Sequence, residues 1–263
     1  GLAGPRRWQR PARLLVMVNL LDLFIVSRLH IDARPSDWAA GTDHFQAVAW
    51  LEKNGGQDRF APDAYGPFRL HNAGMTYDLP SAGGYDSVTT WNIVHFLWLL
   101  NNRAPYPHDA LKHDLAAGFI KRWDTPLIDL LNIRWAMTFG PPGPKWKERF
   151  AFAGKPLAVH EPGHDSRLHI YENPNVLPRA FAVTKTILEP NDAKAARALL
   201  RLDPHKEVLL ATAPPFVPSG VAKEAIPAKA LLLARHKLRF EIEVTENAIL
   251  VISQTHYPGW RAY

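Results

Sequence analysis

Residues 160–164 read His-Glu-Pro-Gly-His and match the H-E-x-x-H pattern of zinc metallopeptidases. That chemistry needs both histidines on one face of a helix, with the glutamate beside the metal-bound water. Proline breaks a helix and glycine weakens it, so His160 and His164 cannot easily take this geometry. We therefore interpret the segment as a loop, and a zinc metallopeptidase stays a remote alternative.

Other catalytic patterns are not recognisable in the chain. Cysteine is absent, which excludes a disulfide framework, thiolate zinc sites and a cysteine nucleophile. The 12 histidines are scattered and form no tight cluster with carboxylates. The chain contains neither a glycine-rich phosphate loop nor a G-x-S-x-G elbow. We therefore predict no catalytic residue, no metal site and no cofactor within this chain.

Aromatic side chains are the best candidates for a binding site. Exposed rings can bind sugars by stacking, and the candidates for glycan contact are Tyr85, Trp91, Tyr257 and Trp260. The alternative for all four is packing in the core or against turns. Trp260, which follows Pro-Gly, is typical of a residue that closes the edge of a β-sandwich.

The positive charge is concentrated at the N-terminus. The formal net charge is +6, and Arg6, Arg7, Arg10 and Arg13 stand in a stretch without an acidic residue. Without these four charges the rest of the chain carries only about +2. Stripes of basic residues interleaved with aromatics, as single-strand binders need, are not evident. This distribution argues against a nucleic-acid partner.

A dense apolar run follows the arginines at residues 14–26. Extended to residue 29, it is about long enough for one membrane span and predicts contact with the lipid bilayer. Its apolar residues favour insertion by roughly 5 kcal/mol, against about 2.5–3.5 kcal/mol for a central acid such as Asp22. The arginines would place its N-terminus in the cytoplasm, with residues after about 30 outside. The alternative is a buried helix of a soluble domain.

Helices dominate the elements expected up to residue 156. Thr42 or Asp43 can cap a helix over residues 43–53, which the Asn-Gly-Gly at 54–56 ends. Further helices are predicted at 88–101, 109–121 and 127–131, with short strands at 68–70 and 133–138. Residues 139–147 are expected to form a loop rich in proline, glycine and lysine.

Strands dominate the elements expected after residue 157. They are predicted at 167–171, 180–184 and 207–211, with one helix at about 190–202. The clearest β pattern comes last, because apolar and polar residues alternate from Leu238 to Thr245 and again from Ile249 to Thr255. With a turn at Glu246-Asn247, this pattern predicts an antiparallel hairpin with one buried face.

Together these elements predict an α+β fold class in three parts. Residues 1–30 form the end of a membrane region with a membrane-helix stem. Residues 31–156 form a mixed α/β subdomain outside the membrane. Residues 157–263 form a β-rich, sandwich-like subdomain with one helix.

Five segments carry a resemblance to one family. Residues 171–181 resemble the Y-E-N-P-x-x-L-P-R-A-F stretch of the YfhO family of bacterial membrane proteins, and residues 255–263 resemble its Y-Y-P-G-W-x-A segment. At the latter, His256 stands where an aromatic residue is usual. Residues 82–87 resemble its G-Y-D-S/P loop, residues 127–138 its L-L-N-V-R-Y-V segment, and residues 20–23 the end of the preceding membrane helix. The order is consistent along nearly the whole chain.

The resemblance implies part of a polytopic membrane protein related to GT-C glycosyltransferases, which use polyprenyl-phosphate-linked sugars. It implies a place in the bacterial cytoplasmic membrane, with most of this chain on the extracytoplasmic side. The catalytic acids of such enzymes are expected upstream of Gly1, and the sandwich is expected to continue past Tyr263. This chain would then shape the acceptor site or contact glycan or the lipid-linked sugar. The alternative is a non-catalytic glycan-binding or protein-interaction module of an envelope complex.

The same resemblance assigns a role to residues 171–181. Their two prolines and two asparagines predict a turn between strands, at the junction of the two outer subdomains. The segment is therefore expected to mark the family without carrying its chemistry.

Overall fold

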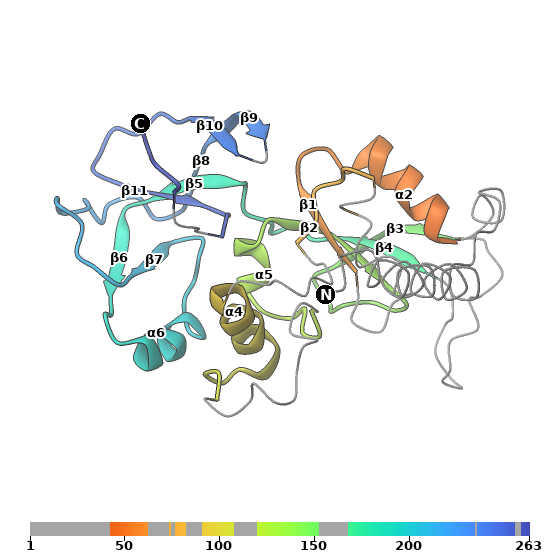
Figure 1. Ribbon diagram of the computed structural model, residues 1–263, viewed down its shortest axis with the longest axis horizontal. Coiled ribbons are helices and arrows are strands. Elements are labelled where there is room, and N and C mark those ends of the chain that lie inside the picture. Colours follow the sequence, from red (N-terminus) through yellow and green to blue (C-terminus); the bar gives the residue numbers. More distant parts are fainter. Residues whose placement is uncertain are drawn as a thin grey trace, which may run out of the picture. The chain divides into compact units, whose positions relative to one another are not determined.

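The computed structural model describes residues 43–62, 74, 77–82, 91–107, 120–152, 168–234, 236–255 and 259–263, with only the backbone of 43–45 and 91. All these residues belong to one compact unit, Thr42–Tyr263. The fold of this part is α+β, with few helices and several small sheets, which confirms the predicted class at that level (Figure 1).

Several predicted features lie outside the described residues. They are the span at 14–29, the strand at 68–70, most of the helix at 109–121 and the His-Glu-Pro-Gly-His segment. Among the helices that the structure does describe, none has the length and apolar character needed to cross a membrane.

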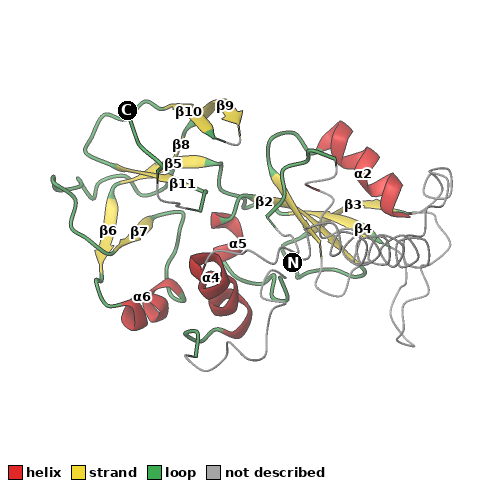
Figure 2. Ribbon diagram, viewed as in Figure 1, coloured by secondary structure: helices red, strands yellow, loops and turns green. Residues whose placement is uncertain are grey.

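A mixed sheet of four strands holds the first part of the fold (Figure 2). The strands are β1 (Arg59–Pro62), β2 (Ile133–Thr138), β3 (Lys147–Ala151) and β4 (His169–Glu172), in the order β1-β2-β4-β3. β1 runs parallel to β2, and the other pairs are antiparallel. β2 has the predicted bounds. The sequence predicts neither β1 nor β3, because β1 is short and β3 exposes all of its residues at the sheet edge.

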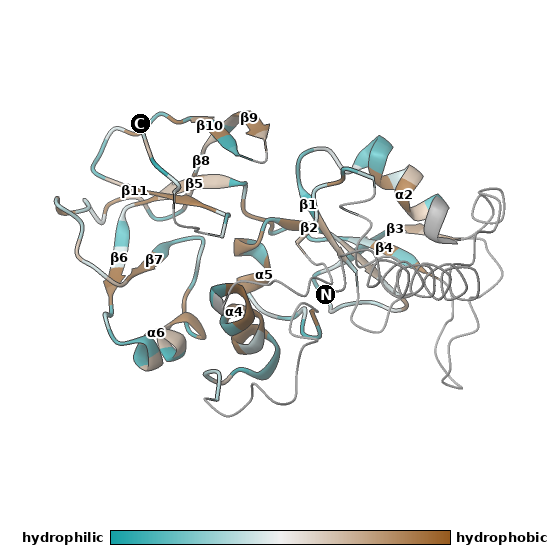
Figure 3. Ribbon diagram, in the orientation of Figure 1, coloured by the Kyte–Doolittle hydropathy of each residue, from teal (hydrophilic) through white to brown (hydrophobic). Residues whose placement is uncertain are grey.

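Helices cover both faces of this sheet. They are α2 (Asp43–Asn54), α4 (Trp91–Asn102) and α5 (Leu127–Leu130). Val48 and Leu51 of α2 pack in one cluster with Ile170 of β4, and Leu100 of α4 packs in another with Tyr171. Successive strand residues point to opposite faces, so the sheet is buried on both sides. Figure 3 shows that α4 carries both hydrophobic and hydrophilic residues.

The ends of two helices form as the sequence predicts. Gly56, just beyond α2, has a φ of 61°, a left-handed conformation that glycine adopts readily. The helix expected at 190–202 is α6 (Asp192–Leu199), and the side chain of Asn191 caps it by accepting a hydrogen bond from the Lys194 N–H at 3.0 Å. Both ends follow from local rules that do not depend on the rest of the fold.

Small sheets make up the C-terminal part. Their strands are β5 (Ala180–Val183), β6 (Lys185–Leu188), β7 (Glu207–Leu210), β8 (Ile226–Pro227), β9 (Lys229–Ala234), β10 (Lys237–Glu241) and β11 (Ile249–Ile252). β11, β5 and β8 form an antiparallel sheet, β6 pairs with β7 in parallel, and β9 pairs with β10. Phe181 and Val183 of β5 are buried, with Ile249 and Val251 packed against them.

The predicted hairpin of the last two strands is wrong. β10 pairs with β9, and β11 pairs with β5, so the two strands do not pair with each other. The expected turn residues bond elsewhere: Asn247 donates its side-chain amide to the Val217 carbonyl at 3.3 Å, and Ser219 donates its hydroxyl to Glu246. The alternation of apolar and polar residues identified β10 and β11 as strands. The side chains of the expected turn residues, Glu246 and Asn247, bond to residues 217–219.

The sheet of four strands also draws on both expected outer subdomains. β4 lies after residue 157, yet it pairs with β2 and β3. The turn predicted within residues 171–181 is present and connects β4 to β5. The first sheet and the C-terminal sheets are therefore joined directly by this segment.

Candidate functional site

The turn between β4 and β5 is anchored in the core by Asn173, which is fully buried. Its side-chain amide donates hydrogen bonds to Asp129 Oδ1 at 2.7 Å and to the Ile133 carbonyl at 3.2 Å. Its backbone N–H bonds to the Arg134 carbonyl at 2.7 Å. A buried amide with satisfied bonds rigidifies a fold, so Asn173 has a structural role.

Asp129, at the centre of these contacts, is 3 % exposed. Lys145 Nζ lies 2.7 Å from Asp129 Oδ1, and His205 Nε2 lies 3.3 Å from Asp129 Oδ2. The carboxylate is therefore surrounded by three side-chain partners from separate segments. Such a network holds α5, the turn and the 203–206 loop together, so Asp129 has a structural role.

A second ionic cluster joins β1, β2, β3 and β4. Arg134 bonds to Asp58 through Nε and to Glu172 Oε1 through Nη1 at 3.2 Å. Arg149 Nε bonds to Glu172 Oε2 at 2.6 Å. Burial alone would lower the pKa of Arg134, but the bonds and charges of Asp58 and Glu172 outweigh it and hold that pKa above its ordinary value. Both carboxylates are thus used by Arg134 and Arg149.

Arg59 and Arg179 differ, because neither forms an ion pair with any described residue. Arg59 Nη1 donates to the Leu131 carbonyl at 3.1 Å and to Ser253 Oγ at 3.0 Å. Arg59 Nη2 donates to Gln254 Oε1 at 3.3 Å, and Arg179 Nη2 donates to the same oxygen at 3.0 Å. Two guanidinium groups therefore share one neutral amide oxygen.

The environment of Arg59 and Arg179 disfavours their positively charged forms. Burial and, to a smaller extent, the neighbouring charge of Arg179 lower the pKa of Arg59 to about 9. Burial also lowers the pKa of Arg179, which the charge of Asp58 partly opposes. Arg179 Nε is buried and has no hydrogen-bond partner among the described residues. Arg59 remains positive at neutral pH, and neither arginine forms an ion pair with a described carboxylate.

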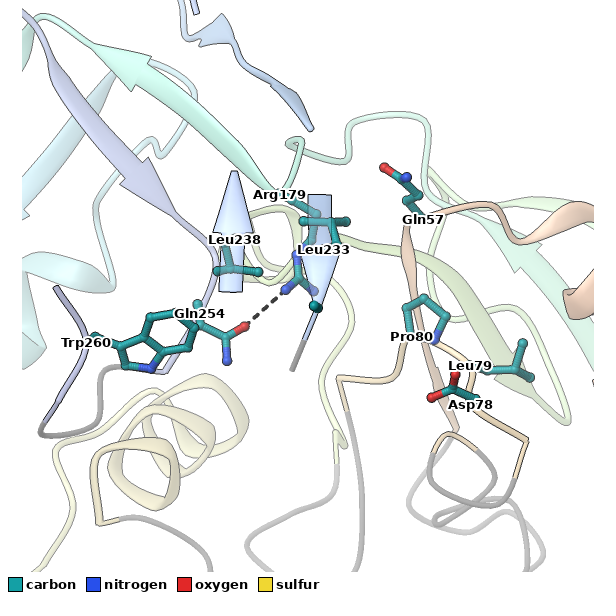
Figure 4. A pocket seen from close by; sticks show the side chains of 10 residues that line it. Gln57, Asp78, Leu79, Pro80, Arg179, Leu233, Leu238, Gln254 and Trp260 are labelled. Carbon is teal, nitrogen blue, oxygen red and sulfur yellow. Dashed lines mark hydrogen bonds between the residues drawn. The ribbon is translucent and has the colours of Figure 1, made fainter. Parts of the chain in front are cut away.

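Arg179 and Gln254 line a pocket of about 270 Å³ (Figure 4). The remaining lining residues are Gln57, Asp78, Leu79, Pro80, Leu233, Ala234, Leu238 and Trp260. Figure 4 shows Arg179, Gln254 and Trp260 on one side and Asp78, Leu79 and Pro80 on the other. The pocket thus combines one aromatic ring, apolar side chains and a few polar groups, as small-molecule sites do.

Backbone hydrogen bonds fix the wall that carries Asp78. The Phe60 N–H donates to the Pro80 carbonyl at 3.0 Å, and the Ala82 N–H donates to the Phe60 carbonyl at 2.9 Å. Residues 77–82 therefore run alongside β1. The opposite wall comes from the β9–β10 hairpin and from the residues that follow β11.

Of the four aromatic residues predicted to contact glycan, the structure places one in this pocket, Trp260. Tyr85 and Tyr257 lie outside the described residues, and Trp91 begins α4 with its side chain not described. His160 and His164 also lie outside. In the described ranges, no three His, Cys, Asp or Glu side chains come together in a group able to hold a metal ion.

Sequence reasoning missed Arg179, Arg59 and Gln254. Arg179 belongs to residues 171–181, which were expected to carry no chemistry, yet its side chain lines the pocket. The one local signal is a cation placed directly before the apolar strand β5. Nothing local pairs it with Arg59, since 120 positions of sequence separate the two residues.

Comparison with protein-family models, curated proteins and solved structures finds no match to this chain.

Proposed function

We propose that this chain is an extracytoplasmic, glycan-contacting part of a bacterial envelope membrane protein, and that the pocket at Trp260 holds the glycan. The larger protein would be a glycosyltransferase that uses a lipid-linked sugar, as the family resemblance implies. In this proposal the chain binds or positions the acceptor, and the chemistry occurs elsewhere.

One observation carries the proposal: Trp260 lines the same pocket as Arg179, Gln57 and Gln254. An indole ring covers the apolar face of a sugar, while guanidinium and amide groups form hydrogen bonds with its hydroxyl groups. Among the pocket-lining residues Asp78 is the only carboxylate, whereas hydrolysis of a glycosidic bond uses two. The pocket therefore suits binding better than hydrolysis.

Glycan binding is tested with the full chain, purified in detergent, on a glycan array. We expect at least one envelope glycan to bind, and Trp260→Ala to weaken that binding by about tenfold or more, as one lost stacking contact would. Phe216→Ala is the matched control, because Phe216 is an aromatic residue that is 40 % exposed and does not line the pocket. Equal loss with both variants, or no binding by the wild type, would reject the proposal.

The membrane part of the proposal is tested separately. The full chain is expected to sediment with membranes and to require detergent for extraction, because of the apolar run at residues 14–29. Deletion of residues 1–30 should abolish this association. If the intact chain stays in solution without detergent and binds no vesicles, the chain is better interpreted as a glycan-binding module of an envelope complex.

A further inference from the structure

Arg179 at the pocket wall and Arg59 beside it form no ion pair with any described carboxylate. Asp58 and Glu172, the carboxylates of the neighbouring ionic cluster, bond to Arg134 and Arg149. Arg59 and Arg179 are bonded only to carbonyl, hydroxyl and amide oxygens. Two guanidinium groups close together repel each other and lose hydration on burial, so a nearby anion would stabilise them.

The geometry around Gln254 shows where an anion would bind. Gln254 Oε1 lies 3.3 Å from Arg59 Nη2 and 3.0 Å from Arg179 Nη2, so it occupies a position that an anionic oxygen would prefer. Arg179 Nε is a buried donor with no partner in the described part of the chain. The planar fork of a guanidinium binds carboxylate and phosphate groups through two donors at once.

Resting on the glycan-binding function proposed above, we propose that the ligand is an acidic glycan whose oxyanion binds at Arg179. A carboxylate or phosphate oxygen would accept hydrogen bonds from this guanidinium, and Arg59 would add a second positive charge behind Gln254. The sugar ring would lie against Trp260, and Asp78 on the opposite wall would accept bonds from its hydroxyl groups. The volume of about 270 Å³ is slightly below that of typical ligand pockets, which suits one sugar unit of a longer chain.

Isothermal titration of the full chain with two matched pairs of probes tests this assignment. Trigalacturonate and its methyl ester have the same sugar chain, and the ester replaces each carboxylate charge by a neutral group that is one methyl larger. Maltotriose 6-phosphate and maltotriose differ only in the phosphate. We expect at least one acidic probe to bind about tenfold more tightly than its neutral partner, as one charge-assisted hydrogen bond provides. The pair that shows this preference identifies the oxyanion.

Variants assign the preference to the proposed residues. Arg179→Gln should remove it, so that the acidic probe loses about tenfold in affinity relative to its neutral partner. Arg179→Lys should keep part of it, because the charge remains while the two-donor geometry is lost. Arg197→Gln is the matched control, since it removes one exposed positive charge on α6.

Gln254→Glu keeps the test informative if Arg179→Gln fails to fold. The new carboxylate would lie between the two arginines and neutralise the site, so the ratio of acidic-probe to neutral-probe affinity should fall to about one. A preference that persists in Gln254→Glu would overturn the proposal. Equal binding of acidic and neutral probes, still lost in Trp260→Ala, would overturn it and leave the glycan-binding function standing. If no probe binds, the acidic-glycan proposal is rejected, and the glycan array decides the glycan-binding function.

Discussion

Replacement of Gln254 by glutamate is expected to stabilise the folded protein. The side chain accepts hydrogen bonds from Arg59 at 3.3 Å and from Arg179 at 3.0 Å, and its exposed position keeps part of a carboxylate in water. Most substitutions destabilise a protein, so a gain here would be specific to the charges of its two partners.

The size of the effect follows from three contributions. The two Nη2 atoms lie 3.3 and 3.0 Å from one oxygen, so they are at most about 6 Å apart. Two like charges at that distance repel by roughly 3 kcal/mol at an effective dielectric constant of about 20, and a carboxylate between them offsets this repulsion. Changing the acceptor from neutral to charged strengthens each hydrogen bond by about 1 kcal/mol. Partial desolvation of the carboxylate opposes both. A net gain of about 1–2 kcal/mol remains, which corresponds to a rise of roughly 2–8 °C in Tm for a chain of this size.

The gain should depend on pH in a predictable way. In the folded state the two arginines lower the carboxyl pKa of the new glutamate, so its contribution is complete above the ordinary value of about 4.3 and is lost as pH falls through the lower folded value. Wild-type Arg59 has a folded pKa of about 9, well below the ordinary value of arginine. Wild type therefore becomes more stable as pH rises above about 9, because folded Arg59 loses its proton there. In the variant the new carboxylate keeps Arg59 protonated, so this increase in stability with pH is smaller. The advantage of the variant should be largest between about pH 5 and pH 9.

Thermal and urea unfolding of wild type, Gln254→Glu and Gln254→Ala across pH 3–10 measure these effects. Gln254→Ala should lose about 1–2 kcal/mol, because both arginines lose an acceptor. A Tm for Gln254→Glu at pH 7 that equals or falls below that of wild type would refute the reasoning. An advantage that does not change with pH would show that the gain has another origin.

Three further predictions concern the ionic networks. Asn173→Ala should destabilise the protein by about 2–4 kcal/mol in urea unfolding, because it leaves buried hydrogen-bond partners unsatisfied. The side chain of Asn175 is exposed, so the control Asn175→Ala should change stability by less than about 0.5 kcal/mol. Lys145→Met should cost about 3 kcal/mol by leaving the buried Asp129 without its cation, and Lys145→Arg should recover part of that loss. The pKa of Asp203 is lowered chiefly by its hydrogen bond to a neighbouring lysine, so Asp203→Asn should be slightly less stable than wild type above pH 4. Solvent screening keeps this difference in stability small, and it should vanish as pH falls towards 2. A difference that stays constant with pH would argue against a stabilising contribution from this pair.

Local elements were predictable where local chemistry decides them. β2 has its predicted bounds, and α2 ends at Asn54 before a glycine with positive φ. Alternation identified both β10 and β11 as strands. It could not identify their partners, because pairing depends on which edge of which sheet is free, and the 217–219 segment takes the expected turn residues.

The amino-acid sequence is enough to predict the α+β class and most of the described helices and strands. It also excludes cysteine chemistry and names Trp260 as a candidate for glycan contact. Only the tertiary structure brought Arg59 and Arg179 to the same amide oxygen and placed Arg179 in the pocket of Trp260. The physical reason is distance along the chain. A cap or an alternating strand depends on residues a few positions apart, whereas a site of this kind exists only where sheets built from distant segments meet.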